Sequence, residues 1–200
     1  MDEPTIARFR QALGDADAFV TNPDLLSAGG HDYWGVGGTP GLLLRPRSTA
    51  EVSAIMRTAY EQGITVVPRG GASNCSGGML PSADCVLLDL SGMNRILDID
   101  LSGLRARVEA GVVNGVLNQQ LARFGICFSP DPVSNAIATI GGNIIENAGG
   151  PHALKYGVTY HHILAVDAVL ADGTITTFDA DADGPDLLGL IIGSEGTLAI

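Results

Sequence analysis

The sequence contains little positive charge. Lys155 is its one lysine, and with the arginines it makes 11 basic residues against 22 acidic ones, a formal net charge of −11. Such a chain is poorly suited to bind nucleic acid, because neutralising phosphates requires a basic surface. A phosphate-bearing ligand would therefore have to be held locally, by main-chain N–H groups instead of by net charge.

Cysteine is also scarce, and metal-binding patterns are absent. Cys75, Cys85 and Cys127 are far apart and form no CxxC pair, which excludes the usual zinc and iron–sulfur ligand runs. The four histidines lack metal-ligand spacing, and the acidic run that begins at Asp179 lacks the glutamate that completes a calcium loop. We expect no metal site, and unpaired cysteines favour a reduced, cytoplasmic location.

Long apolar runs are missing too, so the sequence predicts neither a signal peptide nor a membrane span. The chain has 200 residues, of which 46% are hydrophobic, enough for one domain or two small lobes. Glycine is abundant, with 27 residues, about twice the usual ~7%. The chain stops at Ile200 within an expected strand, which suggests a fragment.

A strand–helix–strand unit is the clearest local pattern. Ser48 and Glu51 have the spacing of a capping box, and apolar residues from 52 to 60 follow at helical spacing. Strands at 42–44 and 64–67 flank this helix, so we expect a parallel pair with a right-handed crossover. The sequence then predicts a strand, a hairpin, a helix, a second hairpin and a short apolar element, at 85–90, 95–109, 114–124, 163–178 and 187–192. Residues 22–41 and 130–150 show no regular pattern.

The first segment that can carry chemistry is PRGGASNCSGG, residues 68–78. It follows a strand, the position where α/β sheets usually bind ligands. Its four glycines remove side chains that would block close approach, and Ser73, Asn74 and Ser76 add neutral donors. A diphosphate suits such a loop, although a plain surface turn is the alternative. It is neither a P-loop nor a dinucleotide GxGxxG motif.

The second segment covers residues 130–150 and contains two Gly-Gly pairs, at 141–142 and 149–150. Glycine within a helix costs about 1 kcal/mol relative to alanine, and a backbone lying against a flat ligand would justify that cost. The alternative is two tight turns flanking a short helix. Lys155 follows directly, either as a cation beside a ligand that becomes anionic or as a solvated surface charge.

Together, four segments resemble the FAD-binding domain of the FAD-linked oxidase family, the fold shared with vanillyl-alcohol oxidase and p-cresol methylhydroxylase. They are PRGGASNCSGG, TIGGNIIENAGGPHALKYGVT, VDAVLADGT and GSEGTLAI, and the likeness begins near Leu42. The resemblance is greatest to glycolate oxidase and D-lactate dehydrogenase flavin subunits. It implies an α+β, two-lobed domain, with a small βαβ lobe over about 1–90 and a larger lobe of mixed or antiparallel sheet with helices over about 91–200. The family's substrate-binding cap domain would be absent from this chain.

The resemblance also implies which residues hold FAD, and no catalytic residue among them. They are Pro68, Arg69, Gly70, Gly71, Ala72, Ser73, Asn74, Ser76, Gly77, Gly78, Pro130, Thr139, Gly141, Gly142, Asn143, Asn147, Gly149, Gly150, Lys155, Tyr156, Gly157, Gly196 and Ile200. Some relatives attach the flavin through a histidine in the first loop. Because this loop has Ala72, Ser73 and Asn74 there, we expect non-covalent FAD.

The implied function is the FAD-binding portion of an oxidoreductase that oxidises a 2-hydroxy acid, such as glycolate or D-lactate, by hydride transfer to the flavin. Its partners would be a small-molecule substrate, an electron acceptor that the sequence does not identify, and possible partner subunits. Two alternatives remain open. One is a non-catalytic FAD-binding module, and the other is a flavoenzyme similar to UDP-N-acetylenolpyruvoylglucosamine reductase.

Overall fold

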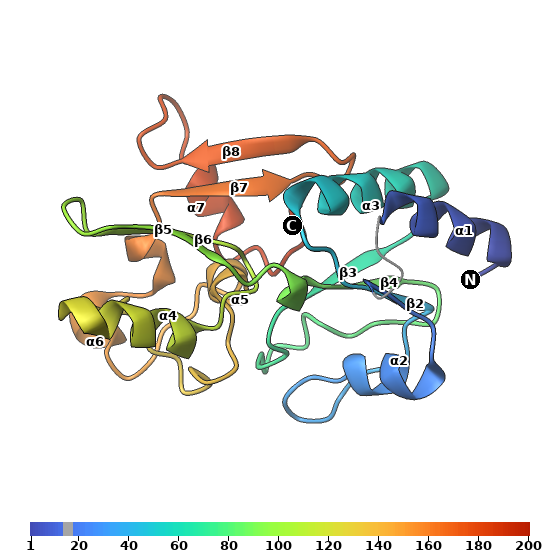
Figure 1. Cartoon of the computed structure of the whole chain (residues 1–200), viewed down its shortest axis with the longest axis horizontal. Coiled ribbons are helices and arrows are strands. Elements are labelled where there is room, and N and C mark those ends of the chain that lie inside the picture. The colour runs from blue at the N-terminus through green and yellow to red at the C-terminus, as the bar shows by residue number, and fades with distance from the viewer. Residues whose placement is uncertain (14–17) are drawn as a thin grey trace.

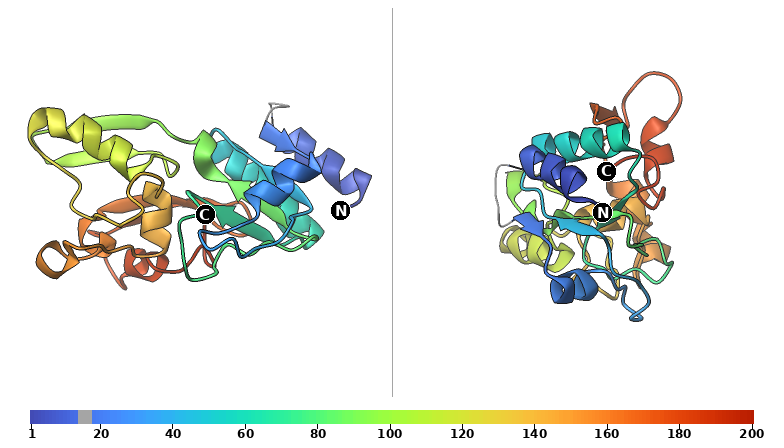
Figure 2. Two further views of the ribbon diagram at one scale, coloured as in Figure 1. Left: turned by 90° about the horizontal axis from the view of Figure 1, so that it is seen from below. Right: turned by 90° about the vertical axis from the view of Figure 1, so that its right-hand side faces the viewer.

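A computed structural model of the protein describes residues 1–13 and 18–200. The molecule has two halves that lie beside each other along its long axis (Figures 1 and 2). The first half of the sequence forms a four-stranded sheet with helices on both faces. The second half forms two hairpins with short helices packed against them.

The four-stranded sheet has the order β1-β2-β4-β3. Its strands are, in that order, β1 (Phe19–Val20), β2 (Leu42–Leu44), β4 (Val86–Asp89) and β3 (Val66–Arg69). β2, β4 and β3 are parallel, and β1 is an antiparallel edge. The predicted pairing of strands 42–44 and 64–67 with each other is therefore wrong, because β4 lies between them. β4 is fully buried, and its apolar residues lie in the middle of the sheet, where helices and loops cover both faces.

Three helices cover this sheet. α1 (Glu3–Ala12) and α3 (Thr49–Gln62) lie on one face, and α2 (Pro23–Gly29) lies on the other (Figure 1). Leu42 and Leu44 pack toward α1 and α3, whereas Leu43 packs toward α2, as the alternation of a strand requires. α3 begins and ends as predicted. The hydroxyl of Ser48 accepts a hydrogen bond from the N–H of Glu51, and Gly63 ends the helix in the left-handed conformation.

Both predicted hairpins are confirmed in the second half. β5 (Ile96–Asp100) pairs with β6 (Arg105–Val108), and β7 (Ala165–Val169) pairs with β8 (Ile175–Asp179). The predicted helix is α4 (Asn114–Leu121), which continues as a 3-10 turn to Phe124. α4 packs its apolar residues against the β5–β6 hairpin, and α7 (Leu187–Ile191) packs against the β7–β8 hairpin. Among the described residues, no helix is long and apolar enough to cross a membrane.

Three helices lie where the sequence shows no periodic pattern. α2 lies within 22–41, α5 (Ile140–Ile145) lies within 130–150, and α6 (Ala153–Tyr156) follows it. α2 and α5 each have a capping side chain, Asn22 and Thr139 respectively, that accepts from N–H groups of the first turn. Because these helices have only 7, 6 and 4 residues, they are too short to show an apolar stripe.

The two halves are joined where the turn of the β7–β8 hairpin meets α3. The hydroxyl of Ser53 donates to the main-chain oxygen of Gly173. A Cβ at Gly173 would lie 2.7 Å from the main-chain oxygen of Ser53 and 2.9 Å from Cβ of Arg57. Gly173 also has left-handed backbone, with φ of 84°. The turn of the second predicted hairpin, which contains Gly173, therefore serves as a contact between the halves.

We expect Gly173→Ala to lower the free energy of unfolding more than Gly125→Ala. Both glycines have positive φ, 84° and 72°, so both variants strain the backbone by about 1–2 kcal/mol. Only Gly173 is crowded, since a Cβ at Gly125 would meet nothing within 4 Å. Overpacking adds about 1–3 kcal/mol. Urea unfolding of the two variants measures the difference, and equal losses would contradict this account of the contact.

Candidate functional site

A cleft of about 140 Å³ lies between the two halves of the molecule. One wall is the loop after β3, residues 70–79. The other wall is α5 with the segment before it, and Glu195 lies at one edge. The loop follows the carboxyl end of a parallel strand, and this is where such sheets place ligands. The sheet thus positions the first predicted segment directly opposite the second.

The main-chain amides of the loop are free. Within the described residues, the N–H groups of residues 71–78 donate to no protein acceptor. Ala72 and Gly77 have left-handed backbone, with φ of 51° and 81°, a conformation that occurs in main-chain concavities that bind anions. Alanine rarely adopts this conformation, and such strain concentrates at ligand sites. The loop therefore offers consecutive donors without a protein partner.

The first two glycines of the loop, Gly70 and Gly71, serve a different purpose from the one that the sequence predicted. A Cβ on Gly71 would overlap the main-chain oxygen of Ile137, and a Cβ on Gly70 would overlap the hydroxyl of Thr139. These glycines let the loop pack directly on the opposite wall. The sequence predicted close approach of the backbone to a ligand, whereas at Gly70 and Gly71 the close approach is to the protein itself.

The second segment, residues 130–150, combines features of its two interpretations, a backbone that lies against a ligand and two turns that flank a short helix. Gly141 packs on Ala110, and Gly150 packs on the main-chain oxygen of Asp131, so turns do flank a short helix. At the same time, Gly142 and the buried Asn143, both in α5, line the cleft. The glycine-rich backbone is therefore used partly for packing and partly for the cleft wall.

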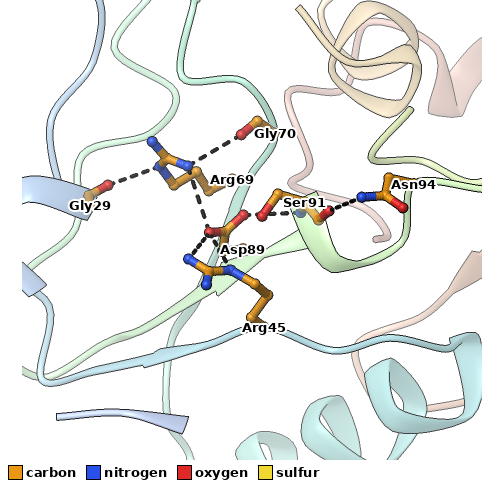
Figure 3. A network of polar contacts seen from close by, with 7 residues as sticks. All are labelled: Gly29, Arg45, Arg69, Gly70, Asp89, Ser91 and Asn94. Carbon is orange, nitrogen blue, oxygen red and sulfur yellow. Dashed lines mark hydrogen bonds and ion pairs between the residues drawn. The ribbon is translucent and has the colours of Figure 1, made fainter. Parts of the chain in front are cut away.

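Arg69 points into the protein and does not line the cleft (Figure 3). Its Nε donates to the main-chain oxygen of Gly29 at 3.0 Å, and its Nη1 donates to that of Gly70 at 3.5 Å. Nη1 also lies 3.7 Å from Oδ2 of Asp89, which accepts two hydrogen bonds from Arg45 at 2.9 and 3.1 Å. Asp89 is only 2% exposed, so this ion network anchors the first residue of the loop to the sheet.

Two carboxylates line the cleft. Ser76 donates to Oε2 of Glu146 at 3.2 Å, and Oε1 of Glu146 and Oε2 of Glu195 both lie close to Gly78. Burial raises the pKa of Glu146 above 4.5, against the hydrogen bond from Ser76, and the charge of Glu195 raises it further. Among the described residues, no Lys, Arg or His lines the cleft, so the shortage of positive charge in the sequence extends to the site. The amides of the loop are what can offset a ligand's negative charge.

A second cavity of about 460 Å³ adjoins the cleft, since Pro68, Gly78 and Glu195 line both. Apolar side chains of α3 and β3 form one side, and the segment 196–200 forms the other. The cleft alone is smaller than the ~300–1,000 Å³ typical of ligand sites. With the adjoining cavity, there is room for an extended ligand.

The structure brings many predicted site residues together and leaves others apart. Those lining the cleft are Pro68, Gly70, Gly71, Ala72, Ser73, Asn74, Gly78, Thr139, Gly142 and Asn143. Gly196 and Ile200 line the adjoining cavity. Lining neither are Arg69, Ser76, Gly77, Pro130, Gly141, Asn147, Gly149, Gly150, Lys155, Tyr156 and Gly157.

Lys155 is exposed, and its ammonium stacks on the ring of Tyr156 at 4.7 Å from the ring centre. Its contact is therefore with Tyr156, outside the cleft. The cleft also contains residues that the sequence analysis did not single out: Met79, Pro132, Ser134, Ala138, Ile145, Glu146, Ala148 and Glu195. Glu146 lies within ENAGG and Glu195 within GSEGT. Because both sequences belong to the segments that carry the family resemblance, the two glutamates could have been included in the predicted site.

Comparison with known proteins identifies the family to which the chain belongs. A family model described as "FAD binding domain" matches residues 40–179. The chain is 42% identical over 164 residues to "Glycolate oxidase subunit GlcD" of Escherichia coli (strain K12), covering 80% of this chain and 33% of that protein. It is 39% identical over 163 residues to "D-lactate dehydrogenase" of Archaeoglobus fulgidus, covering 80% and 36%. The chain thus spans about a third of these curated relatives.

A solved structure of an alkyldihydroxyacetonephosphate synthase has the same fold. It superimposes with a TM-score of 0.86 at 25% identity, covering 100% of this chain and 42% of that one. The predicted α+β FAD-binding fold of the p-cresol methylhydroxylase type is confirmed.

We expect Asp89→Asn to lower the free energy of unfolding by about 2 kcal/mol, because it removes the charge that two arginines share in a buried position. The matched control is Asp167→Asn, whose pair with Arg107 is exposed on both sides. Exposed pairs contribute less than about 1 kcal/mol. Chemical denaturation of both variants gives the comparison, and an equal or smaller loss for Asp89→Asn would rule out the anchoring role.

We expect the stability of the native protein to fall as pH rises through the raised pKa of Glu146. Folding raises the pKa of Glu146 above its ordinary value of 4.5. The stability that Glu146 contributes is therefore fully present below pH 4.5 and is lost as the pH rises above the raised pKa. Glu146→Gln should remove this part of the pH dependence. Unfolding curves across a pH series provide the measurement, with Glu61→Gln, an exposed position on α3, as control. Parallel pH profiles for the native protein and Glu146→Gln would contradict the prediction.

Proposed function

The chain belongs to the FAD binding domain family, and we propose on this basis that it is the FAD-binding portion of an oxidoreductase acting on a 2-hydroxy acid such as glycolate or D-lactate. FAD is the cofactor that the family implies. When bound, it supplies the acceptor for a hydride from the α-carbon of the substrate. The residues of this chain bind and orient it.

The observation that carries the proposal is the set of unpaired amides at residues 71–78, of which residues 71–74 and 78 line a cleft that has no basic side chain among the described residues. FAD contains a diphosphate, and consecutive main-chain N–H groups are the donors that suit it. Oδ1 of Asn74 is buried and accepts no hydrogen bond in the described protein, so it suits a donor group of FAD, such as a ribityl hydroxyl, and not the diphosphate itself. A ligand in the cleft would supply acceptors for the amides and a donor for Oδ1 of Asn74.

The extended shape of FAD fits the two adjoining cavities. We assign the diphosphate to the loop 70–78, the flavin side to α5 with Thr139, Gly142 and Asn143, and the nucleotide end to the larger cavity with Gly196 and Ile200. Roles for predicted residues outside both cavities, such as Lys155, stay predictions. In this proposal FAD is held without a covalent bond, between an N-terminal lobe of about 1–90 and a second lobe of about 91–200.

Partners and location are also proposals. The Escherichia coli relative is named a subunit, which supports the prediction of partner subunits for this chain. The substrate is a small molecule in the relatives' names, glycolate or D-lactate. A cytoplasmic location stays a prediction from the unpaired cysteines.

The first test is FAD binding by the purified chain, followed by flavin absorbance and fluorescence. We expect binding in the native chain, and protection of Cys75, which is exposed within the loop, from a thiol reagent. Cys127 is exposed outside the loop and serves as an internal control, since its rate of labelling should not change. A natively folded chain that does not bind FAD would overturn the proposal.

We expect Gly71→Ala to weaken FAD binding at least tenfold, about 1.4 kcal/mol, because its Cβ would push the loop away from Ile137. Gly41→Ala is the matched control. A Cβ there would likewise overlap a main-chain oxygen, that of Ala83, but Gly41 does not line the cleft. Both variants should lose stability, and only Gly71→Ala should lose affinity. Equal affinities would show that the loop position does not matter for binding.

Turnover distinguishes the catalytic proposal from a non-catalytic FAD-binding module. Anaerobic mixing of the FAD-loaded chain with glycolate or D-lactate should bleach the flavin band. Reduction by NADPH and not by either hydroxy acid would favour the alternative similar to UDP-N-acetylenolpyruvoylglucosamine reductase. An oxidised flavin in all three mixtures would leave the chain as a binding module.

A further inference from the structure

A chain of buried side-chain amides leads from the interior of the second half to the cleft. It starts at Asn114, the first residue of α4, which is fully buried. The NH₂ group of Asn114 donates to the main-chain oxygen of Pro130 at 3.3 Å and to Oδ1 of Asn135 at 2.6 Å. Its Oδ1 accepts from the NH₂ group of Asn143, in α5, at 3.2 Å. Asn143 is 3% exposed and lines the cleft.

The direction of this chain is determined at its inner end. A side-chain amide has a donor end and an acceptor end of similar shape, so its orientation follows from its partners. The main-chain oxygen of Pro130 can only accept, so Asn114 must turn its NH₂ group toward it. The oxygen of Asn114 then faces Asn143 and can only accept, so Asn143 must turn its own NH₂ group inward.

The consequence lies at the outer end. With its NH₂ group directed to Asn114, Asn143 has its oxygen left, and within the described residues Oδ1 of Asn143 accepts no hydrogen bond. If Asn143 were turned over, its oxygen would face the oxygen of Asn114 and both would lack a donor, which is unfavourable in a buried position. Asn143 therefore presents an acceptor to the cleft, opposite a loop that presents donors.

We propose that Asn114 is a positioning residue for the cleft. By orienting Asn143, it requires the ligand group at that wall to be an N–H or O–H donor, and so selects how the ligand lies. This inference rests on the proposed function, since FAD is the ligand considered. FAD carries acceptors at its diphosphate and donors at the ring N3–H and the ribityl hydroxyls. A cleft with donors on one wall and an acceptor on the other admits it in one direction.

The orientation of Asn143 is testable without FAD. In the ligand-free protein, we expect the side-chain NH₂ protons of Asn143 and Asn114 to exchange slowly with solvent in NMR spectra, because both groups donate to protein acceptors. The fast-exchanging reference is Asn94, whose NH₂ group also donates, to the main-chain oxygen of Ser91 at 3.2 Å, but which is exposed to solvent where Asn143 and Asn114 are buried. Exchange of the Asn143 protons at the rate of Asn94 would mean that the NH₂ group faces the cleft, which overturns the proposal whether or not FAD binds.

Variants then test the effect on binding. Asn114→Leu removes the partner that orients Asn143, and Asn118→Leu is the matched control on the same helix. Asn118 makes two hydrogen bonds with the main chain of Phe128 but none with Asn143. We expect both variants to lose thermal stability and only Asn114→Leu to lose FAD affinity, by about tenfold. Similar affinity losses in both would indicate a merely structural role and overturn the proposal.

A purely structural role of Asn114 would not change how the protein discriminates between ligands, so this discrimination is the decisive measurement. Titrations compare FAD with 3-methyl-FAD and with FAD analogues that each lack one ribityl hydroxyl. In the native chain, we expect one of these analogues to bind at least fivefold more weakly than FAD. That ratio should fall to about one in Asn143→Leu and in Asn114→Leu. A ratio unchanged by both substitutions, for every analogue, would disprove the inference even if FAD binds tightly.

Discussion

The candidate site depends on main-chain N–H groups that have no partner in the part of the chain that the structure describes. The chain carries a net charge of −11, and the cleft contains two glutamates and no basic side chain, so neither net charge nor a local cation can attract a phosphate. The amides of residues 71–78 can, because they donate to no acceptor among the described residues. An unpaired amide is costly when buried, so a loop that keeps several of them requires both an open cleft and firm support.

That support comes from contacts behind the loop and beneath it. Arg69 uses its guanidinium to connect Gly29, Gly70 and the buried Asp89, so this cation stabilises the start of the loop. On the other side, Gly70 and Gly71 lie against the segment 137–139 so closely that no side chain would fit. The amide chain from Asn114 to Asn143 stabilises the facing wall in the same manner. Each wall is therefore held by buried polar contacts that end at the cleft.

Local patterns predicted much of the fold correctly. The N-cap at Ser48, the apolar spacing of α3 and the two hairpins each depend on residues close together in the sequence, and all are confirmed. Only half of the expected capping box forms, because the carboxylate of Glu51 accepts from the N–H of Arg47 and not from that of Ser48. The position of β4 between β2 and β3 was missed, since strand order depends on which strand buries the most apolar surface. The helix α2 was missed, and α5 was expected only as an alternative interpretation of its segment, because both are too short for a periodic pattern.

For the candidate site, the sequence alone indicated the two segments that the structure brings to one cleft, which are the glycine-rich loop after a strand and the second glycine-rich segment. Their composition carries that information, because glycine and small polar residues are expensive to place without a structural reason. Only the tertiary structure decided which atoms do what. Arg69 turns away from the cleft, Gly71 makes room for Ile137, and Asn114 orients Asn143 from 29 positions away. These outcomes follow from contacts between segments far apart in the chain, and such contacts leave no periodic trace in the sequence.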